Sequence, residues 1–175
     1  MKFWAGVVVT LVVLIFIGLI IIFSGWYNVS AIHRETGILR WVLNTTSDNS
    51  VEKHAEGINV PDLNSPEKIK EGFAHYNEMC VGCHSAPGKQ ESELAKGLDP
   101  EAPDLSESAK DMSAQELFWV TKNGIKMTGM PAWGKTHSDD KIWNIVAFLE
   151  KLPGMTGAEY DSLEAHTSPM KEEEE

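Results

Sequence analysis

The chain has 175 residues, a formal net charge of −11 and only two cysteines. This length accommodates one ordinary domain with some additional segments. The strong negative charge argues against a nucleic-acid partner and favours an acidic surface that attracts basic partners. With so few cysteines, the fold has to be stabilised by packing rather than by disulfides.

Residues 3–23 are all apolar or small and carry no charge. At about 1.5 Å per residue, a helix of this length spans roughly 30 Å, the thickness of a bilayer core. Trp4 at one end, with Trp26 and Tyr27 at the other, is typical of interfacial aromatic belts. A cleaved signal peptide would have an apolar run of about 7–15 residues and an A-x-A-like site. Neither is present, so we predict an uncleaved transmembrane anchor over residues 1–27.

Residues 28–62 follow as a juxtamembrane linker or docking segment. The run 38–43 is more apolar than a free linker requires. It could lie at the membrane interface, dock a partner subunit, or pack on the domain that follows, and the pattern leaves these alternatives open. Residues 44–50 have the composition of a loop. Asn49 with Glu52 predicts a short helix over 50–56 that ends at Gly57.

The motif Cys80-Val81-Gly82-Cys83-His84 has the spacing of a c-type haem attachment site. Residues three apart share one helical face, so both thiols can reach one edge of a porphyrin, with His84 below the iron. A thiol redox pair would need a βαβ context, and a zinc site would need more cysteines. We therefore predict one covalent haem c, attached through Cys80 and Cys83. Because such attachment normally takes place outside the cytoplasmic membrane, the haem domain should lie on that side.

Helix signals surround this motif, and strand alternation is not convincing anywhere. Ser65 before Pro66 predicts a helix that extends to about residue 80. Gly72 within it suggests a close crossing by another helix. Ser113 with Glu116 forms a capping box for a helix that ends at Asn123–Gly124. A last helix should follow Ser138 and stop at Pro153–Gly154. The fold class is therefore all-α, with residues 85–105 irregular.

On these motifs, residues 63–155 resemble a small monohaem cytochrome c domain of the bacterial type. The matching elements are Gly72 with Tyr76, the 80–84 motif, Pro103-Asp104-Leu105, Thr128-Gly129-Met130-Pro131-Ala132-Trp133, and Ala147-Phe148-Leu149. The resemblance implies an all-α fold that wraps the haem, with the first and last helices crossing at Gly72 against Phe148. It also implies that the carbonyl of Pro103 accepts a hydrogen bond from the His84 ring, as second-shell partners of metal ligands do.

The resemblance implies that His84 and Met130 are the two iron ligands, an arrangement usual in electron-transfer cytochromes c. Met127 is the nearest competitor of Met130, and His137 and His75 are further alternatives. Trp133 is interpreted as a packing residue of the haem pocket. The predicted cofactor-binding residues are Cys80, Cys83, His84, Met130, Pro103, Leu105 and Trp133.

Iron with two protein ligands has no open position for a substrate, so we expect an electron carrier and not an enzyme. The predicted protein is a cytochrome c anchored in the cytoplasmic (inner) membrane of a bacterium, with its N-terminus inside and its haem domain periplasmic. It would carry one electron between respiratory redox partners as a subunit of a membrane oxidoreductase complex. The alternative is a haem-based gas or ligand sensor in which Met130 is displaced. Residues 156–175 are expected to form an acidic, solvated C-terminal tail.

Overall fold

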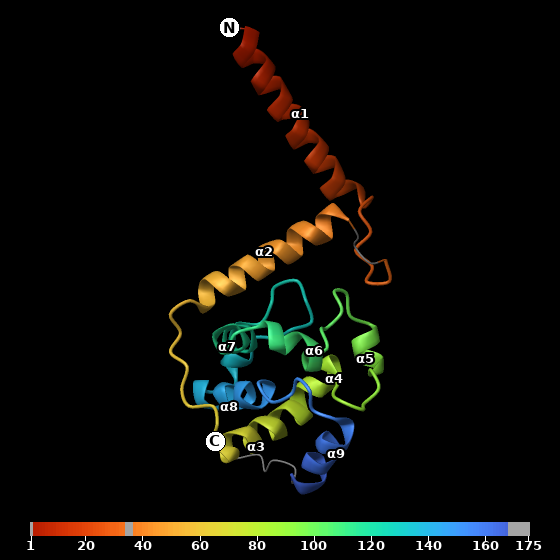
Figure 1. Cartoon of the computed structure of the whole chain (residues 1–175). Coiled ribbons are helices and arrows are strands. Elements are labelled where there is room, and N and C mark those ends of the chain that lie inside the picture. The colour runs from red at the N-terminus through yellow and green to blue at the C-terminus, as the bar shows by residue number, and fades with distance from the viewer. Residues whose placement is uncertain (1, 34–36, 168–175) are drawn as a thin grey trace. The chain divides into compact units, whose positions relative to one another are not determined.

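The computed structural model describes residues 2–33 and 37–167. The chain divides into two compact units, the first of which ends at His33. The described residues form helices and no strand (Figure 1), as expected for an all-α fold. The elements are α1 Lys2–Ser24, α2 Ile38–Ala55, α3 Pro66–His75, the π-helical turn η1 Tyr76–Cys80, α4 Val81–His84, α5 Glu93–Lys96, α6 Leu105–Ser108, the 3-10 turn η2 Ala109–Asp111, α7 Ala114–Asn123, the 3-10 turn η3 Trp133–Lys135, α8 Asp139–Leu149 and α9 Gly157–His166.

The first unit is built on α1, which covers the predicted apolar run with one more residue at each end. None of its side chains is buried within the protein. Among the described residues, α1 is the one helix that is long and apolar enough to cross a membrane. The expected apolar N-terminal helix is therefore confirmed.

The helix that carries the cysteine motif runs without a break from Pro66 to His84, through α3, η1 and α4. Proline occupies the first helical position, as predicted. The hydroxyl of Ser65 does not cap a backbone N–H, and donates to a carboxylate oxygen of Glu67 at 2.6 Å instead. The turn from Tyr76 to Cys80 is π-helical, a wide turn that is often found at functional sites.

The core of the second unit forms where α3 crosses α8 (Figure 1). A Cβ at Gly72 would lie 1.8 Å from the Asn144 carbonyl oxygen and 3.0 Å from Phe148 Cβ, so only glycine fits. Phe73 packs edge-on to Phe148, with ring centroids 5.3 Å apart. Every residue of α8 from Ile142 to Leu149 is buried. The predicted crossing of Gly72 against Phe148 is confirmed.

Helix α7 begins with the predicted capping box. The Ser113 hydroxyl accepts from the Glu116 N–H, while the Ser113 N–H donates to the Glu116 carboxylate at 2.7 Å. The helix ends before Gly124, whose φ is +65°. Leu117 and Phe118 are buried, and the Phe118 ring stacks on Trp143 of α8 at 4.0 Å. This stacking joins α7 to the core.

Helix α2 differs from the prediction. Residues 44–50, expected as a loop, continue the helix that begins at Ile38, and the helix ends before Gly57 as expected. The hydroxyl of Thr46 donates to the carbonyl of Val42 at 2.7 Å, which places this polar side chain within a helical backbone. Val51 and Ala55 are buried in the contact of α2 with α7. Tertiary packing thus overrides the weak helix propensity of these polar residues.

Helix α9 lies inside the segment 156–175 that we expected to be a solvated tail. Thr156 and Glu159 form a second capping box at its start. The side chain of Tyr160 is fully buried, 5.1 Å from the Phe73 ring centroid, and its hydroxyl donates to Asn77 at 2.9 Å. The helix is therefore part of the domain. The remainder of the expected tail, residues 168–175, lies outside the described residues.

Candidate haem site

The two cysteines lie on consecutive turns of one helical segment. Cys80 ends η1 and is buried, whereas Cys83 in α4 is half-buried. Both are free thiols. Burial, followed by the charge of Cys83, raises the pKa of Cys80 to about 12. Thiol redox pairs rely on a lowered pKa, so the environment of Cys80 disfavours that alternative.

His84 is fixed by a carbonyl group from a distant part of the chain. Its Nδ1 lies 2.8 Å from the carbonyl oxygen of Pro103, which can only accept, so Nδ1 carries the proton. Burial lowers the pKa of His84, outweighing the opposite effects of this hydrogen bond and of Asp104. The imidazole is therefore neutral near pH 7, and its Nε2 retains a free lone pair for a metal. The hydrogen bond implied by the resemblance is present.

Three further contacts hold the segment around the cysteine motif. The Tyr76 hydroxyl donates to the carbonyl of Ser85 at 2.7 Å, and the Ser92 hydroxyl donates to the carbonyl of Gly82. Lys89 pairs with Asp161 at 2.9 Å and Glu164 at 2.7 Å, both on α9. Apart from Tyr76 and Gly82, the residues of these contacts were not predicted from the sequence. For Asp161 and Glu164 the sequence does contain a signal, because Thr156 and Glu159 form a capping box that indicates a helix after residue 156.

The loop that carries Met130 is held by hydrogen bonds of the Thr128 side chain to the backbone. The Met130 N–H donates to the Thr128 hydroxyl at 3.1 Å, and the Thr128 hydroxyl donates to the Ile125 carbonyl at 2.8 Å. A Cβ at Gly124 would lie 2.7 Å from the Met130 carbonyl oxygen, so the end of α7 lies directly against the loop. These contacts fix the backbone at Met130, whose side chain is half-buried.

The other residues predicted for the site differ in exposure. Met127 is 95% exposed, and its backbone has a φ of +62°. Trp133 begins η3 and is half-buried, with its ring edge-on to His137 at 5.4 Å. Leu105 begins α6 and packs against the buried core. Met127 therefore points to solvent, while Trp133 and Leu105 belong to the packed part of the domain.

His75 and His137, the histidine alternatives to Met130, lie next to each other. Their ring centroids are 5.7 Å apart and their planes nearly perpendicular. His75 is 6% exposed, and its buried Nδ1 has no hydrogen-bond partner. Burial, then the nearby His137 and Lys141, lowers the pKa of His75, against the opposing effect of Glu78 and Glu71. His75 is therefore held neutral near pH 7.

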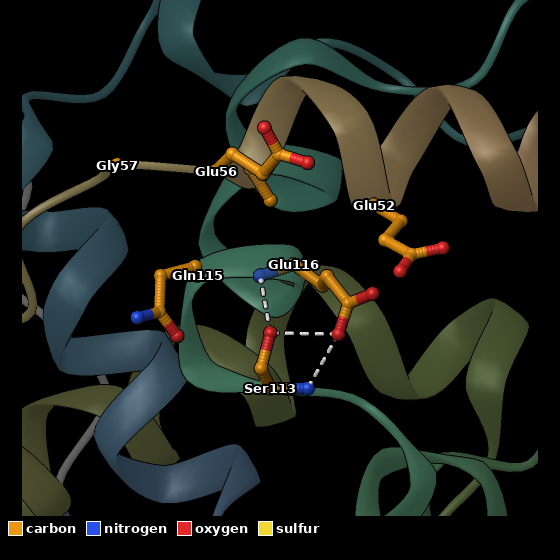
Figure 2. A pocket seen from close by; sticks show the side chains of 7 residues that line it. Glu52, Glu56, Gly57, Ser113, Gln115 and Glu116 are labelled. Atoms are coloured by element: carbon orange, nitrogen blue, oxygen red, sulfur yellow. Dashed lines mark hydrogen bonds between the residues drawn. The ribbon is translucent and has the colours of Figure 1, made fainter.

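A separate hollow of about 350 Å³ lies where the end of α2 meets the start of α7. Figure 2 shows the carboxylates of Glu52, Glu56 and Glu116 around it, with Glu116 bonded to Ser113. The hollow contains no cysteine or histidine. Within residues 2–33 and 37–167, no group of three or more His, Cys, Asp or Glu side chains is arranged to hold a metal ion.

Residues 67–149 match the family described as Cytochrome C oxidase, cbb3-type, subunit III. The chain therefore carries a cytochrome c domain of the monohaem type. The match contains the cysteine motif, the Pro103 carbonyl and the Met130 loop, and it leaves out α1, α2 and α9. No curated protein matches the chain. A cytochrome c domain implies haem c and a role in electron transport.

The residues of this cytochrome c domain fit a haem c group. The fit rests on the two free thiols three residues apart on one helical segment and on the neutral His84, whose Nδ1 is occupied by Pro103 and whose Nε2 is free. A neutral imidazole with its second nitrogen hydrogen-bonded to a carbonyl is the form in which histidine usually binds a metal.

Proposed function

We propose that this cytochrome c is a membrane-anchored electron carrier with one covalent haem, which passes single electrons between respiratory redox partners. The observation that carries the proposal is the locked, neutral His84 beside Cys80 and Cys83. A helix capable of spanning a membrane on the same chain supports the anchored form.

In this proposal Cys80 and Cys83 hold the haem through thioether bonds, and His84 and Met130 are the axial ligands. The exposure of the two methionines supports Met130, because a ligand must lie in the domain interior and Met127 is 95% exposed. Pro103 fixes the His84 ring, while Leu105 and Trp133 complete the apolar surroundings. Burial next to apolar groups and a thioether ligand both raise the reduction potential of a haem.

Haem c supplies a one-electron iron couple when bound, and the residues of the chain decide how it is used. Two axial ligands from the protein would leave no iron position for a substrate, so the cytochrome c domain is a carrier rather than an enzyme. Redox partners of this kind form small, transient contacts. The formal charge of −11 favours partners with a basic docking surface.

The proposed location is the cytoplasmic membrane of a bacterium, with the N-terminus inside and the cytochrome c domain on the periplasmic side. The side is inferred from haem chemistry, because thioether attachment normally takes place outside the cytoplasm. The positive-inside rule adds little, since Lys2 and the terminal amine on one side of the span are nearly balanced by Arg34 and Arg40 on the other. The family description, which names a subunit of an oxidase, supports a role within a membrane oxidoreductase complex.

The axial ligand is tested by Met130→Ala in the full-length haem-loaded protein, with Met127→Ala as the matched control. Met130→Ala should abolish the weak sulfur-to-iron absorption band of the oxidised protein, whereas Met127→Ala should leave it unchanged. Persistence of the band in Met130→Ala would show that another residue is the ligand. Haem staining of the denatured chain, and its loss when Cys80 and Cys83 are both replaced by Ser, checks covalent attachment independently.

The sensor alternative makes a different prediction for the same wild-type protein. A displaceable Met130 would let CO bind the reduced protein without denaturant, whereas an electron carrier with a firmly held ligand should show no spectral change. The hydrogen bonds that fix the Met130 loop favour the carrier.

A further inference from the structure

The first half of α2 exposes a group of large apolar side chains. Ile38 is 81% exposed, Trp41 66% and Leu43 56%, and Leu39 and Val42 are also exposed. A water-soluble surface helix normally places such residues toward the core. The five residues, referred to below as the apolar half of α2, therefore require an environment that the domain itself does not provide.

These side chains point away from the domain. Val42 precedes Val51 by nine residues, which is two and a half helical turns, so the two lie on opposite faces of α2. Val51 is 7% exposed and lies in the contact with α7, whereas Val42 is 42% exposed. The face opposite the packed one is therefore apolar near the start of α2, and the half-buried Arg40 lies away from it.

We propose that the apolar half of α2 inserts into the interfacial layer of the same membrane that holds α1. Residues 25–37 connect the two helices, and an extended chain of that length reaches at most about 45 Å. Given the membrane anchor proposed above, the start of α2 stays within about 45 Å of the end of α1. Apolar side chains with a tryptophan and a flanking arginine are the composition found at membrane interfaces.

The connecting segment shows the same preference for apolar residues. Trp26 is 82% exposed, Val29 88% and Ile32 87%. Each of these side chains would be stabilised at the boundary between headgroups and acyl chains, which lies next to the end of α1. A membrane contact at the start of α2 therefore continues the interface that the anchor already makes.

The second half of α2 limits the extent of this contact. Asp48 and Glu52 are exposed there, and Lys53 is paired at 2.7 Å with Glu56, which follows the helix. Carboxylates are repelled by anionic headgroups. Arg40 is the one basic residue in the first half. Insertion should therefore be driven by apolar burial, should stop before Asp48, and should not require anionic lipid.

The test uses one introduced cysteine in the full-length haem-loaded protein, where haem attachment should have consumed Cys80 and Cys83. Val42→Cys places a polarity-sensitive dye on the apolar half. Asn49→Cys, seven residues later and on the same face, is the matched control. Both proteins are placed in phosphatidylcholine nanodiscs. We expect blue-shifted emission and protection from iodide quenching at position 42, and water-like emission with full quenching at position 49.

Several outcomes would overturn the proposal. Equal iodide quenching at positions 42 and 49 would show that the apolar half stays in water. Protection at position 42 in native membranes but not in lipid nanodiscs would assign it to a partner protein. A blue shift that requires phosphatidylglycerol would assign the contact to Arg40 and anionic headgroups. Labelling of the parent protein, with no cysteine added, would instead indicate a failure of haem attachment, which is a separate proposal.

Discussion

The crossing of α3 with α8 and the contact of α2 with α7 are two helix contacts of opposite character. At the crossing, the backbones meet at Gly72, and the rings of Phe73, Phe148 and Tyr160 are almost fully buried. The contact of α2 buries Val51 and Ala55 beside an open, acidic hollow. The cytochrome c domain is thus built tightly around the helix that carries the cysteines, and α2 is attached to it through a much smaller apolar surface.

The largest effect is expected at the crossing. Gly72→Val would place side-chain carbon atoms within the space of the Asn144 carbonyl, and the helices would have to separate. Overpacking of this kind, added to the loss of the aromatic contacts, should cost more than about 3 kcal/mol in free energy of unfolding. Denaturant titration followed by circular dichroism measures this loss, together with the yield of haem-loaded protein.

Gly97→Ala is the control for the effect of an added methyl group. Gly97 ends α5 with a φ of −88°, and a Cβ there would lie 3.5 Å from the nearest atom, an ordinary contact. The control should therefore unfold as the wild type does. A stable Gly72→Val protein with normal haem content would show that the crossing tolerates displacement. It would contradict the view that α3 and α8 are packed more tightly than α2 and α7.

A smaller and more local effect is expected for Val51→Ala. Removing two buried methyl groups should cost about 1–2 kcal/mol. Because Val51 is one of the two buried residues of α2, the change should raise the amide hydrogen exchange of α2 and leave that of α3 and α8 unchanged. Val42→Ala, at an exposed position of the same helix, should not alter the amide hydrogen exchange of α2. Equal acceleration in α3 and α8 would show that α2 belongs to the same cooperative unit.

The smallest effect concerns His75, the buried polar residue of α3. Its pKa is lowered in the fold, so near and below the usual value of 6.5 the unfolded chain binds more protons than the folded one. The free energy of unfolding should therefore fall as the pH falls through 6.5. His75→Leu should remove this part of the pH dependence, while His166→Leu, at an exposed position, should retain it. Identical pH profiles for wild type and His75→Leu would exclude the mechanism.

The parts predicted well from the sequence are those with a local physical cause. Pro66, the Ser113–Glu116 capping box and Ser138 mark helix starts because each supplies a preference within one turn. Gly72 indicated a close crossing because a glycine inside a helix is unfavourable without one. The cysteine motif was readable for the same reason, since its five residues lie on one short helical segment.

The parts predicted poorly depend on contacts between distant residues. Asn44 to Ser50 have the composition of a loop, yet they are helical because Val51 and Ala55 are buried against α7. The π-helical turn at Tyr76–Cys80 has no separate signature in the sequence. The contacts of Lys89 with α9 join residues more than seventy positions apart. The role of Met130 as iron ligand remains a prediction, supported by its loop and by the exposure of Met127.

The ion pairs between Lys89 and α9 have a practical consequence for making shortened versions of this protein. A fragment cut at the limits of the family match, residues 67–149, would keep the cysteines and Met130 but lose Tyr160, Asp161 and Glu164. The segment just after His84 would then lose its partners, and Phe73 would be uncovered on one side. A soluble version for spectroscopy or crystallisation should therefore extend at least to His166, and any purification tag should follow α9.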